Sequence, residues 1–345
     1  MPFDRVLVVG LGLIGGSIAK ALQPHYDIVV HDPDADVMRR AAADGFTLAP
    51  TIADTMTPAT LVVIAAPVEA IPETLALVAE ANQAVASLPG TADQRDRKPL
   101  VTDVCSVKQS VIDTARECGL RFVGGHPMAG SEHHGYGAAT DSLFSGARWA
   151  LAIDDTTDLD DWFAVAHVVG RMGAAAMPVR GDAHDRAVAA ISHLPHVLAA
   201  GLASVTDGPD GDLMVGLAAG SFRDGTRVAR SSPHFWASVL ADNGANMVPL
   251  LRSMSSQLAT LADELAAGDA LAVHNYFAVG ARERVRYENR NAVAHTIICD
   301  TDADARRVLL DIGARGGSVT GHERVDGRRN IHVRVPDAVI PRALR

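Results

Sequence analysis

Residues 6–22 read VLVVGLGLIGGSIAKAL, and this stretch decides the fold of the N-terminal part of the chain. Four branched apolar residues, typical of a buried strand, run directly into the glycine pattern GLGLIG at 10–15. A helix-forming run follows without a break. The order of strand, glycine-rich turn and helix predicts that this turn holds the pyrophosphate of a dinucleotide.

Each glycine of the turn has a physical reason. Gly10 allows the tight turn, Gly12 lets backbone approach the pyrophosphate, and Gly15 lets the helix pack closely against the strand. Leu13 and Ile14 stand between them, where the first N–H groups of the helix point at the anion. An ordinary α/β turn that binds no ligand is the alternative.

An acidic residue narrows the expected ligand. Asp32 follows the next expected strand, DIVVH at 27–31. A carboxylate at this place accepts hydrogen bonds from the ribose 2′-OH and repels a 2′-phosphate. Arg39 and Arg40 lie a helical turn or more further on, too far to compensate. We therefore expect NAD rather than NADP as the cofactor.

Composition and charge limit the class of protein. The chain has 345 residues, 48% of them hydrophobic and 21% charged, as in a soluble globular protein with two domains and a small extra piece. Its net charge of −10, without a basic stripe, argues against a nucleic-acid partner. Three cysteines without CxxC spacing indicate a reducing cytoplasm and exclude a disulfide framework. The uncharged run at 6–19 lacks a basic segment before it, so we expect neither a signal peptide nor a membrane partner.

Residues 1–180 are expected to form an α/β dinucleotide-binding domain. Short apolar runs alternate with helix-like stretches, which predicts a Rossmann-type parallel sheet with crossover helices. Residues 86–99 are polar and rich in turn formers, so they are expected to form an exposed loop. The expected strands are residues 5–9, 27–31, 61–65, 100–104, 121–124, 149–153 and 174–179.

The remainder of the chain divides into two parts. Residues 181–290 are rich in Ala and Leu, which predicts an all-helical second domain, with Asp182 and Ser232 as N-caps. Residues 291–345 return to β character and predict a small β-α-β-β unit, with Asp326-Gly327 as its hairpin turn. About 50 residues cannot bury a core alone, so we expect this tail to pack on the helical domain or on a second copy of the chain.

Two polar segments follow expected strands, at the edge of the sheet where a ligand would lie. In DVCSVK (103–108), Ser106 either orients a neighbouring base or a ribose, or caps the next helix. In GGHPMAGSEHHG (124–135), His126 suits a general base near neutral pH, the alternative being a loop histidine on a flexible hinge. The adjacent His133-His134 pair lacks HExxH spacing, and adjacent residues rarely face one ligand together, so we expect no metal site.

A third polar constellation lies in the expected helical domain. Residues 192–196 read SHLPH, in which Pro195 interrupts a helix between two histidines, and this predicts a pocket. Arg227 ends the segment SFRDGTR and suits bidentate capture of a carboxylate. A surface ion pair is the alternative for Arg227.

Together these segments resemble the prephenate dehydrogenase family, which includes arogenate and cyclohexadienyl dehydrogenases. The resemblance covers roughly residues 1–290 and rests on GLGLIGGS, DVCSVK, GGHPMAGSEHHG, SHLPH and SFRDGTRVARSSPHFW. It implies a nucleotide domain followed by a helical dimerisation domain, and hence a homodimer. It also implies a reaction of tyrosine biosynthesis, in which prephenate loses a hydride from C4 to NAD, a hydroxyl proton and CO₂ to become 4-hydroxyphenylpyruvate.

The resemblance assigns the catalytic groups by position. His126 matches the catalytic histidine that hydrogen-bonds the substrate hydroxyl. Ser106 matches the serine that orients this histidine and contacts the nicotinamide side of the cofactor. Both residues lie in the segments that follow expected strands.

The resemblance also assigns the substrate-binding groups. His196 and Arg227 match residues that bind the substrate carboxylates, and His193 lies beside them. Glu132 matches an acidic residue near the pocket mouth. Asp224 matches an acidic residue that supports the arginine segment.

Three alternative functions are weighed against this one. The substrate could be arogenate, or both arogenate and prephenate, because the sequence places no acidic residue clearly against an ammonium group. A β-hydroxyacid dehydrogenase would use a lysine of its second domain, but residues 182–345 contain none. A dinucleotide-sensing regulator would have no need for Ser106, His126, His196 and Arg227 together.

The tail carries a separate expectation. Its β-α-β-β pattern is shorter than the β-α-β-β-α-β regulatory (ACT) domain of some family members, so it is ACT-like. Tyrosine is a candidate feedback inhibitor bound there, and two half-units from two protomers could complete one sheet.

Overall fold

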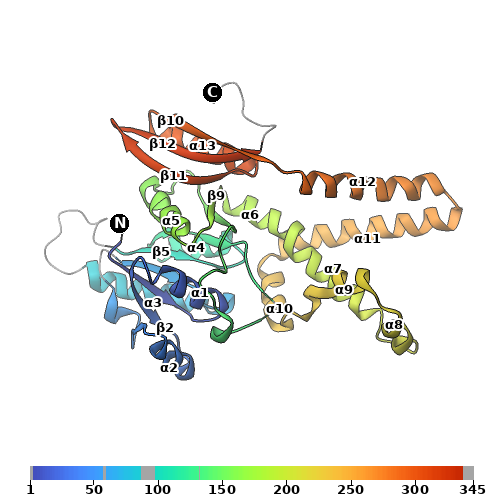
Figure 1. Ribbon diagram of the computed structural model, residues 1–345, viewed down its shortest axis with the longest axis horizontal. Helices are drawn as coiled ribbons and strands as arrows, with labels where there is room; N and C mark the ends of the chain where they lie inside the picture. The colour runs from blue at the N-terminus through green and yellow to red at the C-terminus, as the bar shows by residue number, and fades with distance from the viewer. Residues whose placement is uncertain (1–2, 57–59, 87–97, 132, 337–345) are drawn as a thin grey trace. The chain divides into compact units, whose positions relative to one another are not determined.

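The computed structural model describes residues 3–56, 60–86, 98–131 and 133–336, and these fold into two compact units. The first unit contains the residues up to 184 together with residues 294–335, and the second contains residues 185–293 (Figure 1). The C-terminal tail therefore belongs to the same unit as the glycine-rich turn.

The first unit contains a six-stranded parallel sheet in the order β3-β2-β1-β4-β5-β6, the doubly wound order of dinucleotide-binding domains. The order reverses between β1 and β4, so a ligand is expected at the carboxyl ends of these two strands. The strands are β1 (Arg5–Val9), β2 (Asp27–His31), β3 (Thr47–Leu48), β4 (Thr60–Ile64), β5 (Leu100–Asp103) and β6 (Arg121–Val123). The helices are α1 (Leu13–Leu22), α2 (Ala35–Ala43), α3 (Ile71–Ala86) and α4 (Gln109–Glu117), with short turns η1 (Ala53–Thr55) and η2 (Val68–Ala70).

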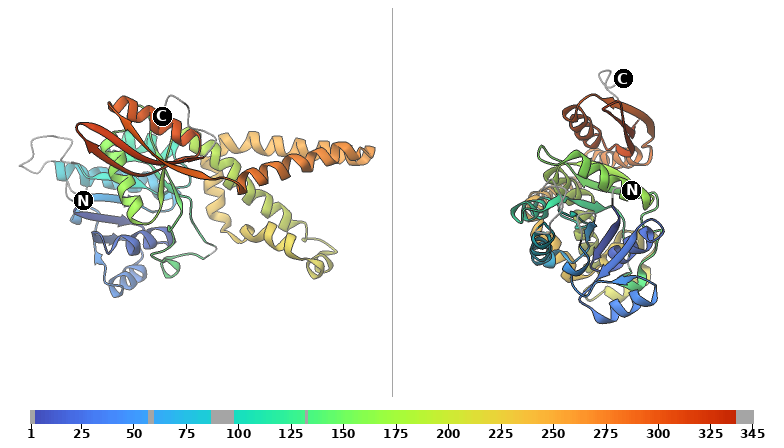
Figure 2. Two further views of the ribbon diagram at one scale, coloured as in Figure 1. Left: turned by 45° about the horizontal axis from the view of Figure 1, so that its top comes forward. Right: turned by 90° about the vertical axis from the view of Figure 1, so that its left-hand side faces the viewer.

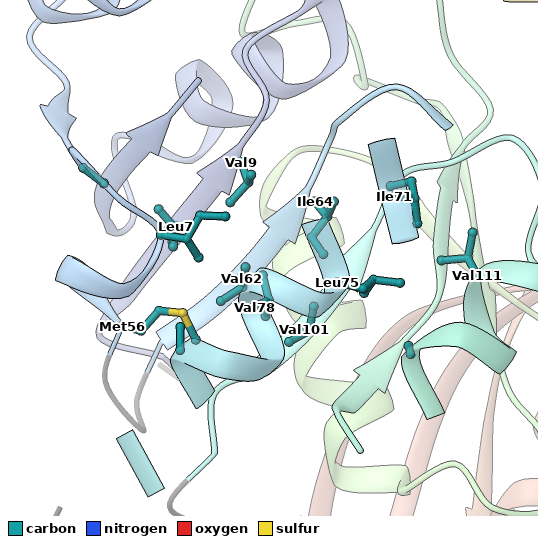
Figure 3. Close-up of a cluster of buried hydrophobic side chains, with 14 of the residues drawn as sticks. Leu7, Val9, Met56, Val62, Ile64, Ile71, Leu75, Val78, Val101 and Val111 are labelled. Carbon is teal, nitrogen blue, oxygen red and sulfur yellow. The ribbon is translucent and has the colours of Figure 1, made fainter. Parts of the chain in front are cut away.

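The core of this sheet is made by strand residues that face α3. Leu7, Val62 and Val101 come from three adjacent strands, and all three are fully buried (Figure 3). Leu75 and Val78 of α3 pack against them. Five of the predicted strands are confirmed as members of this parallel sheet, and the two-residue β3 was too short to be predicted.

A second sheet follows in the same unit, and here the expectation of one parallel sheet is wrong. Its order is β10-β12-β11-β9-β8-β7. The chain leaves the first sheet after Val123, and β7 then pairs antiparallel with β8. The elements are β7 (Gly125–Pro127), η3 (Tyr136–Ala138), β8 (Arg148–Ala152), α5 (Leu159–Arg171), β9 (Ala175–Val179), β10 (Ala292–Cys299), α13 (Asp302–Ala314), β11 (Ser318–Val325) and β12 (Arg328–Pro336).

The tail has the predicted β-α-β-β order, but it belongs to the first unit, so its predicted packing on the helical domain is wrong. Its packing on a second copy of the chain stays a prediction. Its strand β11 pairs antiparallel with β9, where Val319 lies opposite Ala176. Helix α13 approaches β9 so closely that a Cβ on Gly313 would lie 1.6 Å from the carbonyl oxygen of Pro178. Without the tail, this edge of β9 would have unpaired backbone N–H and C=O groups. Backbone groups at a sheet edge need partners, which explains why the tail packs on β9. The predicted Asp326-Gly327 turn is confirmed, with φ of 49° and 80°.

A buried arginine links the tail to α5. Arg329 is 1% exposed and binds the carboxylate of Asp302 through Nε (2.7 Å) and Nη2 (3.2 Å). Its Nη2 also lies 2.9 Å from Asp160, and its guanidinium lies over the Phe163 ring. On β11, His322 stacks on Phe163 with ring centroids 3.9 Å apart. We call these five residues the Arg329 cluster.

The second unit is all-helical, as predicted. Ser232 caps α10 through Phe235 N–H (3.4 Å), whereas α6 begins at Gly181, so Asp182 lies in its first turn rather than at its N-cap. Helices α11 and α12 run antiparallel side by side (Figures 1 and 2). The elements are α6 (Gly181–Val188), the π-helical turn η4 (Ala189–His193), α7 (Leu194–Ser204), α8 (Gly211–Leu217), α9 (Gly220–Thr226), η5 (Arg227–Arg230), α10 (Pro233–Asp242), α11 (Gly244–Ala267) and α12 (Ala270–Glu288).

Much apolar surface of this helical unit is exposed. Several large apolar side chains on α8 and α12 are more than half exposed, among them Leu217 (75%), Leu271 (69%) and Phe277 (66%). Where such side chains gather into a patch, they mark an interaction site. By length and composition alone Gly181–Ser204 could also cross a membrane, a criterion that core helices of soluble proteins meet as well.

Candidate active site

The glycine-rich turn between β1 and α1 has the geometry of an anion site. Gly10 has a φ of +93°, and a Cβ there would lie 2.6 Å from the carbonyl oxygen of Ala65. A Cβ on Gly15 would lie 1.9 Å from the carbonyl oxygen of Gly10, so the helix and the turn touch. Around Gly12 no atom lies within 4 Å of the Cβ position. That open face and the uncapped first turn of α1 leave room and N–H donors for a diphosphate.

Asp32 stands at the end of β2 beside this turn. Its carboxylate accepts hydrogen bonds from the backbone N–H groups of Leu11 (2.7 Å) and Asp34 (2.8 Å). These two bonds fix the carboxylate against the glycine turn. Because an ionised carboxylate has about four acceptor positions, capacity remains for ribose hydroxyls. The residues present therefore fit a dinucleotide.

A cavity of about 650 Å³ opens next to the first residue of α1, Leu13. Both His133 and His134 line it, and the expectation that they do not bind one ligand together stays a prediction. Ser131 and Thr140 add hydroxyl groups to the lining. Among the described residues, no group of three or more His, Cys, Asp or Glu side chains could hold a metal ion. The predicted pocket-mouth residue Glu132 lies outside the described residues.

The segment that lines this cavity is fixed to α1 and α2. The Tyr136 hydroxyl donates a hydrogen bond to Asp44 (2.7 Å), and burial together with this carboxylate raises the pKa of Tyr136. The same hydrogen bond, with Lys20 nearby, lowers the pKa of Asp44. A Cβ on Gly16 would lie 2.8 Å from the Ala139 methyl group, so a side chain on α1 would displace the segment.

His126 lies in the middle of the short strand β7, opposite Ala150 of β8. Its Nδ1 is 2.9 Å from Nε2 of His184, and the two rings meet edge to face with centroids 5.1 Å apart. His184 is 3% exposed and comes from α6. Sequence reasoning did not identify His184. The sequence signal that could have identified it is its position near the start of a helix, just after the last strand of the N-terminal half.

Ser106 is half-buried in the turn between β5 and α4, as predicted from its motif. In the described part of the chain, the structure gives no hydrogen bond between Ser106 and His126. The residue that contacts Nδ1 of His126 is His184. The proposed orienting role of Ser106 stays a prediction.

The second unit holds the predicted histidines of the SHLPH segment. Pro195 falls in the first turn of α7, and the preceding turn is π-helical. Such π turns accommodate a local irregularity and often occur at functional sites. His196 Nδ1 is 2.8 Å from the Ser192 carbonyl oxygen, and its ring packs against Trp236 with centroids 4.0 Å apart. His196 is therefore held with its Nε2 edge away from the helix backbone.

His193 has a different environment from His196. It is 1% exposed, and its Nδ1 lies 3.2 Å from the amide nitrogen of Asn243. Asn243 is itself buried and donates to the Asp185 carbonyl oxygen (2.9 Å). These contacts give His193 a place in the core of the helical unit, supporting α6, η4 and α10.

Arg227 begins the turn η5 and is exposed, in the short segment between helices that was predicted. Asp224 accepts a hydrogen bond from Arg223 Nε (3.1 Å), and both of these side chains are exposed. Asp224 thus contacts the neighbouring arginine. Arg227 and His196 belong to the second unit, and His126 and the glycine turn belong to the first.

Comparison with known proteins matches two consecutive domain models to the chain. The model described as the nucleotide-binding domain of prephenate dehydrogenase matches residues 18–177. The model described as the dimerization domain of prephenate dehydrogenase matches residues 180–279. One match falls in the first unit and the other almost entirely in the second, and neither includes the tail.

Named relatives agree with the domain matches. The prephenate dehydrogenase of Bacillus subtilis is 34% identical over 257 residues, which are 70% of this chain and 64% of that protein. The cyclohexadienyl dehydrogenase of Zymomonas mobilis is 30% identical over 284 residues, 79% of this chain and 92% of that protein. The chain thus spans somewhat under two thirds of the B. subtilis protein.

Two solved structures share the fold. A candidate prephenate dehydrogenase from Corynebacterium glutamicum is 33% identical, with a TM-score of 0.71 over 83% of this chain and 90% of that chain. The Aquifex aeolicus prephenate dehydrogenase, solved with hydroxyphenyl propionate and NAD⁺, superposes with a TM-score of 0.73 over 83% of this chain and 99% of that chain. At 24% identity the latter shows the fold alone.

Proposed function

Because the chain belongs to the prephenate dehydrogenase family, we propose that it oxidises prephenate with NAD to 4-hydroxyphenylpyruvate and CO₂. The observation that carries this proposal is the environment of His126. A histidine held by a second histidine, in the same unit as an open glycine turn, supplies a base for alcohol oxidation by a dinucleotide.

The reaction balances without net release of a proton. Hydride leaves C4 of the ring, the C4 hydroxyl gives up its proton, and the C1 carboxylate departs as CO₂ with its bonding electrons left in the ring. The phenolate oxygen then takes back one proton. Bound NAD supplies the hydride acceptor. Formation of the aromatic ring favours the products, so the protein has to place the groups and move the proton.

His126 is the group that we assign to the proton. Since Nδ1 faces Nε2 of His184, the proton acceptor is Nε2 of His126. In this arrangement Nδ1–H donates to His184, which fixes the tautomer and supports the imidazolium that forms when the hydroxyl proton arrives. The same imidazolium returns the proton to the phenolate.

His196 and Arg227 are the groups that we assign to the two substrate carboxylates. With Nδ1–H of His196 donating to the Ser192 carbonyl, the Nε2 edge donates to a carboxylate only when the ring is protonated. Arg227 is exposed and offers a fork that pairs with a carboxylate in two parallel hydrogen bonds.

The position of Asp32 supports NAD rather than NADP as the cofactor. Its carboxylate is fixed beside the turn by two backbone N–H groups and would repel a 2′-phosphate. Further along α2, Arg39 forms an exposed ion pair with Asp36.

Arogenate is the second candidate substrate, because the Z. mobilis relative is named a cyclohexadienyl dehydrogenase. Arogenate differs from prephenate by an ammonium group in place of a keto group. The arginine and histidine groups favour the substrate without this positive charge. A kcat/KM ratio measured for the two substrates, each with NAD and with NADP, tests the assignment. Higher values for prephenate and NAD are expected, and a preference for arogenate or NADP would overturn the corresponding part.

We further propose a cytoplasmic homodimer that forms through the helical unit. The exposed apolar side chains of α8 and α12 supply a surface for this contact, and the match to a dimerization domain supports it. Tyrosine stays a candidate inhibitor acting through the tail. Sedimentation of the purified chain and the initial rate at increasing tyrosine concentration test these two points.

A further inference from the structure

The turn between β5 and α4 closes around a fully buried ion pair that the reaction steps above do not use. Asp103, the last residue of β5, and Lys108, the residue before α4, are both 0% exposed, and their charged groups are in direct contact. Moving two charges out of water is costly, and apolar residues of similar size would stabilise the fold as well or better. A buried pair at this place therefore calls for a reason other than stability.

The Asp103 carboxylate contacts three separate segments. Its Oδ1 accepts a hydrogen bond from the backbone N–H of Gly125 (2.9 Å). Its Oδ2 accepts one from the backbone N–H of Cys105 (2.9 Å) and also binds Nζ of Lys108. One carboxylate thus ties the end of β5 to β7, to the following turn and to the start of α4.

The two backbone groups held in this way adjoin the residues assigned to catalysis. Gly125 directly precedes His126, and Cys105 directly precedes Ser106. Strand β7 has only three residues, with His126 in the middle. On one side it pairs with β8, and on the other its N–H is held by Asp103. The position of the His126 backbone is therefore fixed from both sides.

The contact leaves little freedom for adjustment. A Cβ on Gly125 would lie 2.6 Å from the carbonyl oxygen of Asp103, so the strand passes directly over the end of β5. Three donors converge on the two carboxylate oxygens, and an amide of the same size would turn an NH₂ group toward at least one of these donors. Lys108 supplies the compensating charge that a buried carboxylate needs.

We propose that Asp103 and Lys108 are positioning residues, which hold His126 and Ser106 in register with the substrate and the nicotinamide. This rests on the proposed function, since it assigns a purpose to the pair through His126. The carboxylate is fully buried and contacts the neighbouring segments. Its effect is on the placement of His126 and Ser106.

The test is a double-mutant cycle on kcat. Asp103→Asn keeps the shape of the side chain but replaces one acceptor by an NH₂ group that faces N–H donors. We expect kcat to fall about 10- to 100-fold, the scale of a misplacement near 1 Å, with KM for prephenate and NAD changed by less than about threefold. In a His126→Asn background the same substitution should change the residual rate by less than about threefold.

The matched control is Thr102→Val. Thr102 adjoins Asp103, is 4% exposed, and its hydroxyl is buried without a hydrogen-bond partner among the described residues. Valine has nearly the same shape, so this variant disturbs the same buried region without touching the carboxylate. We expect its kcat to stay within about twofold of the unsubstituted protein.

A second variant covers the case in which Asp103→Asn does not fold, as judged by its melting curve. Asp103→Glu keeps the charge opposite Lys108 but moves the carboxylate by one methylene group. It should lower kcat with unchanged KM and lose this effect in the His126→Asn background.

The outcomes separate this inference from the proposed function. An Asp103 variant that lowers kcat by the same factor in both backgrounds would show a purely structural role and overturn the inference. A wild-type kcat for folded Asp103→Asn or Asp103→Glu would do so as well. If His126→Asn alone retained full turnover, the proposed function would fail first.

Discussion

Replacing Arg329 by methionine tests how the tail is attached to the nucleotide-binding unit. Arg329 is buried, and its guanidinium bridges Asp302 of α13 and Asp160 of α5. Methionine fills most of the volume of the aliphatic stem and removes the charged head. The substitution therefore isolates the ionic part of the Arg329 cluster, while Phe163 and His322 remain stacked.

The size of the loss follows from the exposure of the two acceptors. Hydrogen bonds to charged groups contribute about 1.5–3 kcal/mol each when the partner becomes unsatisfied on removal. Here Asp302 and Asp160 are 59% and 66% exposed, so water replaces much of what they lose. We expect the free energy of unfolding to fall by about 2 kcal/mol in total, which is at the low end for this set of contacts. In a unit of roughly 150–250 residues this lowers Tm by about 4–8 °C.

Calorimetry at one fixed protein concentration measures the effect, because association would otherwise shift Tm. Arg328→Met is the matched control. Arg328 is the neighbouring residue, 61% exposed, and its partner Asp300 is 70% exposed. Arg328→Met should lower the free energy of unfolding by less than about 0.5 kcal/mol. Equal shifts for the two variants, or no shift for Arg329→Met, would refute the attachment of the tail through this cluster.

Three further predictions concern the cofactor turn, the substrate site and pH. Gly12→Ala meets no atom within 4 Å, so Tm should stay unchanged while KM for NAD rises by about tenfold or more; a lowered Tm would contradict this. Arg227→Ala should raise KM for prephenate about 10- to 100-fold. The control is Arg223→Ala, at a neighbouring exposed arginine, and equal KM values for the two variants would remove Arg227 from the site. Burial and the Arg329 charge lower the pKa of His322 from 6.5 to about 4. Between these two pH values the unfolded chain binds more protons than the folded chain, so the free energy of unfolding decreases as pH falls. The stability advantage of the wild type over His322→Gln should thus shrink from about pH 7 to about pH 5 in urea titrations, and an advantage that stays constant would speak against this account.

The sequence was informative where structure depends on near neighbours along the chain. The strands of the first sheet follow from runs of branched apolar residues such as those at 6–9, and all four of these residues are buried. The turn at Gly10 follows from the glycine spacing, because close approach and a positive φ leave few alternatives. The helical unit follows from Ala- and Leu-rich periodicity together with caps such as Ser232.

Pairing between distant segments could not be predicted in the same way. The second sheet joins β9 to β11, and nothing local to residues 175–179 indicates a partner more than a hundred residues later. The contact between His126 and His184 has the same origin, since it depends on where α6 begins after β9. Asp103 was quoted only as part of a motif, because its role depends on the backbone N–H of Gly125. Side-chain burial and contacts between segments distant in the sequence depend on the whole fold, so local sequence patterns do not specify them.

The most direct test of the central claim is steady-state turnover of prephenate with NAD by the wild type and by His126→Asn. For the wild type we expect NADH and CO₂ to form in equal amounts. His126→Asn should lower kcat by about 10²- to 10⁴-fold, the usual contribution of a positioned base, while KM for prephenate changes little. Near-normal kcat in His126→Asn, or no prephenate-dependent NADH from the wild type, would contradict the account.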